Sequence, residues 1–129
     1  MSEKFKVEII SPSETILKLD TSEVIIPSYE GEMGILKDHI ALITFLRPGI
    51  IHIKNEPKID YFIEEGIVEF ANNTLLILTS TAKELSGIES SSIKNLIIEA
   101  EKKIKSDTIT DKEKYLLSYK INTLKNISL

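Results

Sequence analysis

The chain has 129 residues, 42% of them hydrophobic and 28% charged, and its formal net charge is −4. This length allows one domain with a hydrophobic core, or a small domain with an appendage. The sequence contains no cysteine, which excludes disulfides, thiolate metal sites and cysteine nucleophiles. Its only arginine and the lack of a basic stripe exclude a nucleic-acid binder.

Charge is divided unevenly along the chain. Residues 1–85 carry 14 acidic and 8 basic side chains, whereas residues 86–129 carry 6 acidic and 8 basic ones. We therefore expect two parts with different surfaces. No apolar run reaches membrane-spanning length and the first residues form no apolar signal core, so we expect no direct membrane insertion. Any contact with a membrane would then run through a partner.

Short apolar runs separated by turn residues dominate the first part. Phe5, Val7 and Ile9 alternate with polar residues, which indicates a strand with one buried face. Further strands are predicted at residues 15–19, 23–26, 41–46, 50–53, 61–63, 67–70 and 75–79. Asn72 and Asn73 tolerate the left-handed backbone that a tight hairpin turn needs. Strands this short, recurring about every 8–12 residues, predict an all-β sandwich or barrel in residues 1–85.

The segment at residues 25–51 organises this part of the chain. A strand ends in Pro27, and residues 30–34 (Glu-Gly-Glu-Met-Gly) follow it. Acidic side chains between two glycines are difficult to bury, so we predict a loop that presents them to solvent or a partner. His39, an apolar run and the tripeptide Arg-Pro-Gly at residues 47–49 complete the segment.

The pattern changes near Gly87, beyond which the chain has neither glycine nor proline. One apolar helix face is predicted from Ile93, Ile97, Ala100 and Ile104. A second is predicted from Leu117, Ile121 and Leu124. We expect one of the serines at 90–92 to cap the first helix, and Thr110 or Asp111 to cap the second. Because two helices this small cannot form a stable core alone, the hairpin at 86–129 must pack on the β part or on another protein.

The order of residues in the organising segment resembles the epsilon subunit of F-type ATP synthases. That family has a small residue, then Glu-Gly-acidic-hydrophobic-Gly-hydrophobic, then His, then Leu/Ile-hydrophobic-Thr, then basic-Pro-Gly. This chain supplies Ser28, residues 30–35, His39, residues 42–44 and residues 47–49 in that order. It departs from the pattern by lacking the prolines that usually flank the histidine. The resemblance implies a β-sandwich of about ten short strands followed by a C-terminal antiparallel helical hairpin.

The resemblance also implies a function. It implies a non-catalytic rotor subunit that links the gamma subunit to the membrane ring of c subunits and couples proton flow to ATP synthesis. His39 stands where the family has a residue close to gamma, Glu32 where it has an acid facing the polar loops of the ring, and Ser11 at the end of the first strand near the same interfaces. The implied location is peripheral, on the cytoplasmic face of a bacterial inner membrane or the equivalent side in an organelle.

The hairpin is implied to be a movable arm that restrains ATP hydrolysis through the catalytic alpha and beta subunits. Some family members bind ATP there through an [IL]-D-x-x-R-A motif, which matches residues 88–93. In this chain the acid is Glu89, and Ser92 stands where the motif has arginine. Because serine supplies no charge to hold a phosphate, we expect ATP binding to be weak or absent, and we expect no other cofactor.

Other functions stay open from the residues alone. A stand-alone β-sandwich could bind a small molecule in a deep pocket. A small hydrolase could use Asp38 and His39 as an acid–base pair, or His39, His52 and an acid could hold a metal. Neither the hydrolase nor the metal hypothesis has the accompanying nucleophile or ligand spacing that is typical of such sites.

Overall fold

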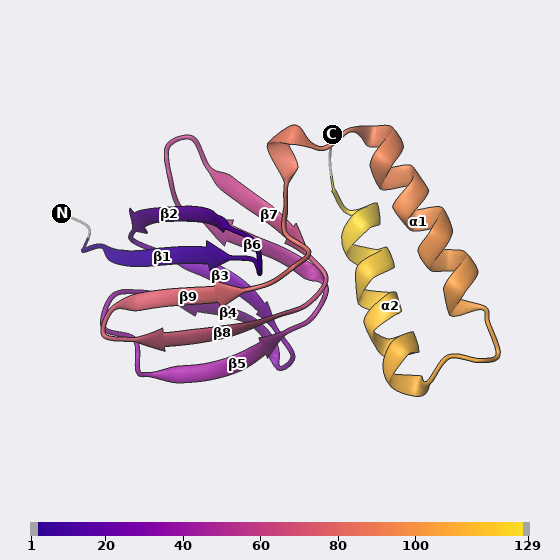
Figure 1. Ribbon diagram of the computed structural model, residues 1–129, viewed down its shortest axis with the longest axis horizontal. Helices are drawn as coiled ribbons and strands as arrows, with labels where there is room; N and C mark the ends of the chain where they lie inside the picture. The colour runs from indigo at the N-terminus through magenta and orange to yellow at the C-terminus, as the bar shows by residue number, and fades with distance from the viewer. Residues whose placement is uncertain (1–2, 128–129) are drawn as a thin grey trace.

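The computed structural model describes residues 3–127 and shows two β-layers with a helical hairpin at one end (Figure 1). The strands are β1 (Phe5–Ile10), β2 (Thr15–Thr21), β3 (Val24–Ser28), β4 (Gly31–Ile35), β5 (Leu42–Leu46), β6 (Gly49–Ile53), β7 (Ile59–Ile63), β8 (Gly66–Ala71), β9 (Thr74–Leu78) and β10 (Lys83–Glu84). The helical elements are η1 (Leu85–Gly87), α1 (Ser90–Ile104) and α2 (Asp111–Lys125). The predicted sandwich of about ten strands with a C-terminal hairpin is confirmed.

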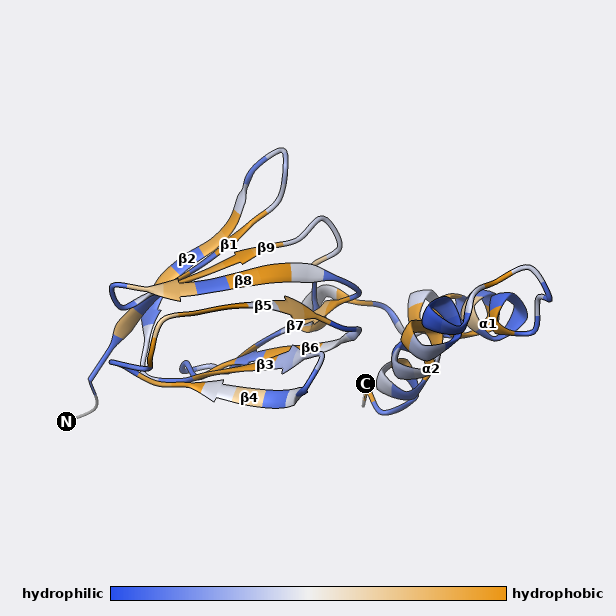
Figure 2. Cartoon of the chain, turned by 90° about the horizontal axis from the view of Figure 1, so that it is seen from below, coloured by the Kyte–Doolittle hydropathy of each residue, from blue (hydrophilic) through white to orange (hydrophobic). Residues whose placement is uncertain are grey.

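The strands form one continuous sheet that folds over on itself. Its order is β10-β7-β6-β3-β5-β8-β9-β1-β2, with β4 paired to the side of β3. The sheet folds over between β3 and β5, which pair antiparallel at Ser28 and Leu46. One layer therefore contains β4, β3, β6, β7 and β10, and the other contains β5, β8, β9, β1 and β2 (Figure 2). In the second layer β1 lies between β9, to which it runs parallel, and the edge strand β2.

Inward-facing side chains of the two layers form the main core. Alternation along β1 places Phe5, Val7 and Ile9 inside, as the sequence pattern predicts. The Phe5 and Phe70 rings pack edge to face with their centroids 5.6 Å apart. The other fully buried members come from both layers and include Ile26, Ile35, Ile51, Ile53, Leu75 and Ile77.

The stretch predicted as an acidic loop is instead strand β4, so this part of the prediction was wrong. Residues 29 and 30 form a two-residue turn, and β4 pairs with β3 from Ser28–Gly31 to Val24–Ile35. Gly31 has a φ of +125°, a backbone that favours glycine, and its carbonyl accepts a hydrogen bond of 2.6 Å from Ser28 Oγ. Met33 and Ile35 face inward while Glu32 faces out. Because Gly31 and Gly34 have no side chains, the alternation of inward and outward residues along β4 could not be recognised in the sequence.

Turn and cap chemistry follow the sequence at some places and not at others. Asn72 and Asn73 have φ of 52° and 54°, which confirms the predicted left-handed turn between β8 and β9. Thr110 caps α2, and its reciprocal hydrogen bonds with Glu113 form a capping box. The expectation that a serine caps α1 was wrong. The N-cap is Glu89, which makes no side-chain cap bond, and the three serines form the first helical turn.

A second buried cluster joins the hairpin to the sandwich. Phe62, Ile93 and Leu124 are its buried members, each at most 5% exposed. Strand β7 is buried on both faces, because Tyr61 and Ile63 point into the main core while Phe62 points toward the helices. The hairpin thus packs on the sandwich in this structure, with α2 against β6. Within the described residues, none of the helices is long and apolar enough to cross a membrane.

Candidate partner interface

Apolar side chains lie exposed on the outer surface of the second layer. Cross-strand register aligns Phe45 on β5 with Ile67 on β8, and Ile67 with Leu78 on β9. These three side chains are 55%, 42% and 44% exposed, and Ile43, two residues before Phe45 on the same face, is 70% exposed. Figure 2 shows hydrophobic colour along much of β5, β8 and β9, interrupted by hydrophilic segments on β8. Glu69 on β8 is exposed on the same face as Ile67 and lies opposite Ile43. We call this surface the outer apolar face. The exposed apolar row of Phe45, Ile67 and Leu78 across three strands indicates an interaction surface.

Ser11 lies at one end of the outer apolar face. It lines a groove of about 630 Å³ together with Tyr29, Phe45, Ile67 and Leu78. The Tyr29 and Phe45 rings lie 6.5 Å apart at this end. The Ser11 hydroxyl also holds the turn after β1, where it lies 3.2 Å from both the amide nitrogen and the carbonyl oxygen of Glu14.

His39 lies at the opposite end of β5 from that groove. Its ring packs edge-on against Phe70 at 5.9 Å, and its Nδ1 lies 2.8 Å from the Ile40 carbonyl oxygen. The neighbouring Ile40 is 77% exposed. Ser11 and His39 therefore flank the outer apolar face from its two ends.

Glu32 is separate from both of these residues. It is exposed on β4, in the other layer, opposite Pro27. It lines a larger groove, of about 950 Å³, which runs between the sandwich and α2 and also borders Arg47 and Tyr119. The three residues predicted as interface sites thus lie on two surfaces rather than one.

The Asp38–His39 pair does not have the geometry of a catalytic dyad. The Asp38 carboxylate accepts a hydrogen bond of 2.9 Å from Asn73 Nδ2. The backbone amide of Asp38 donates a hydrogen bond of 2.7 Å to Asn73 Oδ1. Asp38 adopts a φ of 66°, so this reciprocal pair holds the turn that leads into β5. The carboxylate is thus used in fixing the loop, while the His39 ring nitrogen Nδ1 lies against the Ile40 carbonyl instead.

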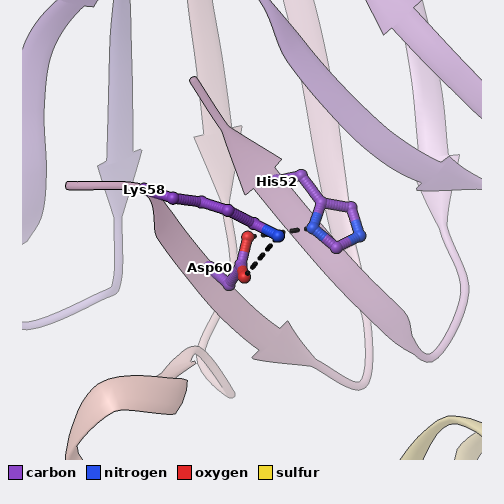
Figure 3. Close-up of polar contacts among 3 residues, drawn as sticks. All are labelled: His52, Lys58 and Asp60. Carbon is purple, nitrogen blue, oxygen red and sulfur yellow. Dashed lines mark hydrogen bonds and ion pairs between the residues drawn. The ribbon is translucent and has the colours of Figure 1, made fainter. Parts of the chain in front are cut away.

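The other histidine takes part in a small polar cluster across β6 and β7. His52 Nδ1 lies 2.9 Å from Asp60 Oδ1, and Lys58 Nζ lies 3.4 Å from Asp60 Oδ2 (Figure 3). The two strands place His52 and Asp60 opposite each other in register. Among the described residues, no group of three His, Asp or Glu side chains could hold a metal ion. The cluster combines a cross-strand contact between His52 and Asp60 with an ion pair between Lys58 and Asp60 at the start of β7.

Comparison with known proteins places the fold in a family. A family model described as the β-sandwich domain of the ATP synthase delta/epsilon chain matches residues 4–85. The ATP synthase epsilon chain of Pelagibacter ubique (strain HTCC1062) is 48% identical over 130 aligned residues, which cover 99% of this chain and 100% of that one. The chain belongs to the ATP synthase delta/epsilon family.

Two further proteins similar to this delta/epsilon chain are more distant. The mitochondrial ATP synthase subunit delta of Schizosaccharomyces pombe is 39% identical over 105 residues, covering 78% of this chain and 62% of that one. A chain in the cryo-EM structure of the Euglena gracilis mitochondrial ATP synthase (OSCP/F1/c-ring) has a TM-score of 0.74 at 24% identity, covering 95% of this chain and 78% of that one. This structural likeness shows the fold. The resemblance seen in residues 25–51 is confirmed, while the roles of Ser11, Glu32 and His39 stay predictions.

Sequence reasoning missed the outer apolar face, although a signal for it was present. The β5 segment (Leu-Ile-Thr-Phe-Leu) and the β9 segment (Thr-Leu-Leu-Ile-Leu) are apolar on both faces. An antiparallel strand at the surface normally alternates apolar and polar residues. Apolar residues on both faces of two strands in one layer therefore indicate a second covered surface, which in the isolated chain is open.

Proposed function

We propose that this delta/epsilon chain is a non-catalytic rotor subunit, which joins the gamma subunit to the ring of c subunits and passes torque between proton flow and ATP synthesis. Family membership supports its place in an ATP synthase. The Euglena structure is of OSCP, F1 and a c-ring, so a chain of the same fold occurs in an assembly that contains both F1 and a ring. The observation that carries the proposal is the outer apolar face.

The outer apolar face suits a protein partner better than a small ligand. Its exposed side chains span the width of three paired strands, and Ser11 and His39 flank its ends. Flat apolar surfaces with polar margins are typical of stable protein interfaces. We assign this face to gamma. We assign Glu32, which lies on the other layer and is exposed, to the polar loops of the ring.

Calorimetric titration with a purified gamma subunit tests this assignment. Phe45→Asp places a charge on the face and is expected to weaken binding more than about tenfold. Ile98→Asp is the matched control, because Ile98 is 61% exposed but lies on α1, away from the face. His39→Ala is expected to weaken binding to gamma, and Glu32→Ala to leave it unchanged while lowering retention of the c-ring. No binding at micromolar concentration, or equal losses in Phe45→Asp and Ile98→Asp, would refute the assignment.

We further propose that the hairpin restrains ATP hydrolysis by contacting the catalytic alpha and beta subunits when it leaves the sandwich. Lys102 and Lys103 are exposed near the end of α1 and suit an acidic surface. Reversing both charges should raise hydrolysis by the reassembled complex, which an ATPase assay measures.

ATP itself is proposed to bind weakly or not at all, because Ser92 lies in the first turn of α1 and brings no cation there. Equilibrium dialysis with labelled ATP tests this.

The proposed location is peripheral, on the cytoplasmic face of a bacterial inner membrane or the equivalent side in an organelle. It follows from the proposed contact with the ring. Fractionation of membranes with and without the c subunits tests it: the chain should sediment with membranes only when the ring is present. Sedimentation that does not depend on the ring would contradict the proposal.

A further inference from the structure

Two consecutive side chains of α2 contact two different turns of the sandwich. Arg47 Cζ lies 3.9 Å from the centre of the Tyr119 ring, and Lys120 Nζ lies 2.6 Å from Glu64 Oε1. Successive helical residues project about 100° apart, because an α-helix has about 3.6 residues per turn. Contacts made by two adjacent residues in different directions therefore fix the rotation of the helix about its axis, as well as its distance from the sandwich.

The sandwich side of both contacts is held in place. Arg47 lies in the two-residue connection between β5 and β6, and its amide donates at 3.0 Å to the Pro27 carbonyl. Glu64 lies in the two-residue connection between β7 and β8, and its amide donates at 3.0 Å to Thr81 Oγ1. The pairing of β5 with β8 places these connections at the same end of the sandwich. Release of the hairpin therefore requires α2 to move away from fixed partners.

The polar contacts and the apolar cluster have different physical roles. Phe62, Ile93 and Leu124 supply burial, which attracts the hairpin without specifying its orientation. The Glu64 and Lys120 side chains are 32% and 17% exposed, so both are largely withdrawn from water. In a docked position where the two side chains do not meet, each charge is poorly solvated and has no partner. Such positions are therefore disfavoured.

We propose that Arg47–Tyr119 and Glu64–Lys120 form a polar latch that selects one docked position of the hairpin and keeps the hairpin closed. The latch is a property of the isolated chain, so it does not depend on the function proposed above.

Hydrogen exchange of the intact chain, resolved by segment, tests the latch, because it detects openings that are rarely populated. Lys120→Glu and Glu64→Lys place like charges together, and each is expected to lower the protection of α2 amides roughly tenfold. The double swap, Glu64→Lys with Lys120→Glu, restores the opposite charges and is expected to return protection to within about twofold of wild type. Tyr119→Leu keeps apolar bulk but removes the ring, and should lower protection about threefold.

The matched control is Lys125→Glu. Lys125 pairs with Glu101 of α1 at 3.1 Å, inside the hairpin, and reversing its charge disturbs the helix C-terminus at least as much as reversing Lys120 does. Protection of the β-strands reports whether each variant still folds. The latch proposal is overturned if Lys120→Glu lowers the protection of α2 amides no more than Lys125→Glu does, or if the double swap fails to restore that protection. Greater α2 protection loss for Lys120→Glu, with recovery in the double swap, supports it.

Discussion

Truncating Phe62 should detach the hairpin and leave the sandwich folded. Phe62 is fully buried, but in the cluster between the sandwich and the helices rather than in the main core. Replacing a buried phenylalanine by alanine costs about 3–5 kcal/mol. Phe70→Ala is the matched control, because Phe70 is 1% exposed and lies in the main core against Phe5.

The size of the second cluster sets the expected result. Among the residues that the structure describes, its buried side chains are Phe62, Ile93 and Leu124. At about 1.5–3 kcal/mol each, they contribute roughly 5–9 kcal/mol before the entropy of ordering the hairpin is subtracted. The loss of about 3–5 kcal/mol in Phe62→Ala is therefore comparable with the whole net docking energy, and it shifts the docking equilibrium by roughly a hundredfold or more.

Segment-resolved hydrogen exchange with a parallel urea titration separates the two variants. In Phe62→Ala, amides of α1 and α2 should lose nearly all protection, because a free hairpin of this length is only marginally helical. Strands β1, β8 and β9 should keep theirs. In Phe70→Ala all strands should lose protection together and the urea midpoint should fall. The reasoning is refuted if Phe62→Ala leaves the helices protected, or if it weakens the strands as much as Phe70→Ala does.

Three further changes are expected to have measurable effects. Thr110→Ala removes the cap of α2 and should lower the stability of the hairpin by about 1 kcal/mol in thermal melts followed by circular dichroism, and an unchanged melt would contradict the role of the cap. Gly49→Ala should lower the free energy of unfolding, measured in urea, by about 1–3 kcal/mol, because an added Cβ would lie 2.5 Å from Cβ of the Pro27 ring. Gly34→Ala should leave the free energy of unfolding nearly unchanged, because nothing lies within 4 Å of its added Cβ. Burial raises the pKa of Tyr61 above 10, so the folded state keeps this proton to a higher pH than the unfolded state does. The resulting stability is complete below pH 10 and is lost as the pH rises through the higher folded pKa. Tyrosinate absorbance, measured together with unfolding at several pH values, follows this loss.

Periodicity was sufficient to predict most of the fold from the sequence. Strand β1 shows the alternation that burial of Phe5, Val7 and Ile9 requires, and the Asn-Asn turn specifies its own backbone. Strand β4 was missed because Gly31 and Gly34 leave only Met33 and Ile35 to mark a period of two. Strand β10 has two residues and carries no apolar signal at all.

The candidate interface could be predicted from sequence only in outline. Ser11 and His39 came from a family resemblance, and the sequence could not reveal that they lie at opposite ends of one surface. That surface depends on register: Phe45, Ile67 and Leu78 come together only because three strands align them. The contacts of Tyr119 and Lys120 with the sandwich were likewise invisible, because they depend on how α2 is placed on two distant turns.

The parallel pairing of β1 with β9 also determines the order in which the protein can be completed on the ribosome. The first strand ends at Ile10, and the partner that fills the space beside it ends at Leu78. Synthesis at about 5–20 residues per second leaves β1 waiting roughly 3–14 s for β9, with only the β2 hairpin to cover one of its edges. The hairpin helices emerge after the sandwich has become able to close. Helix α2, which follows the sandwich in the chain, can therefore dock on a surface that is already formed.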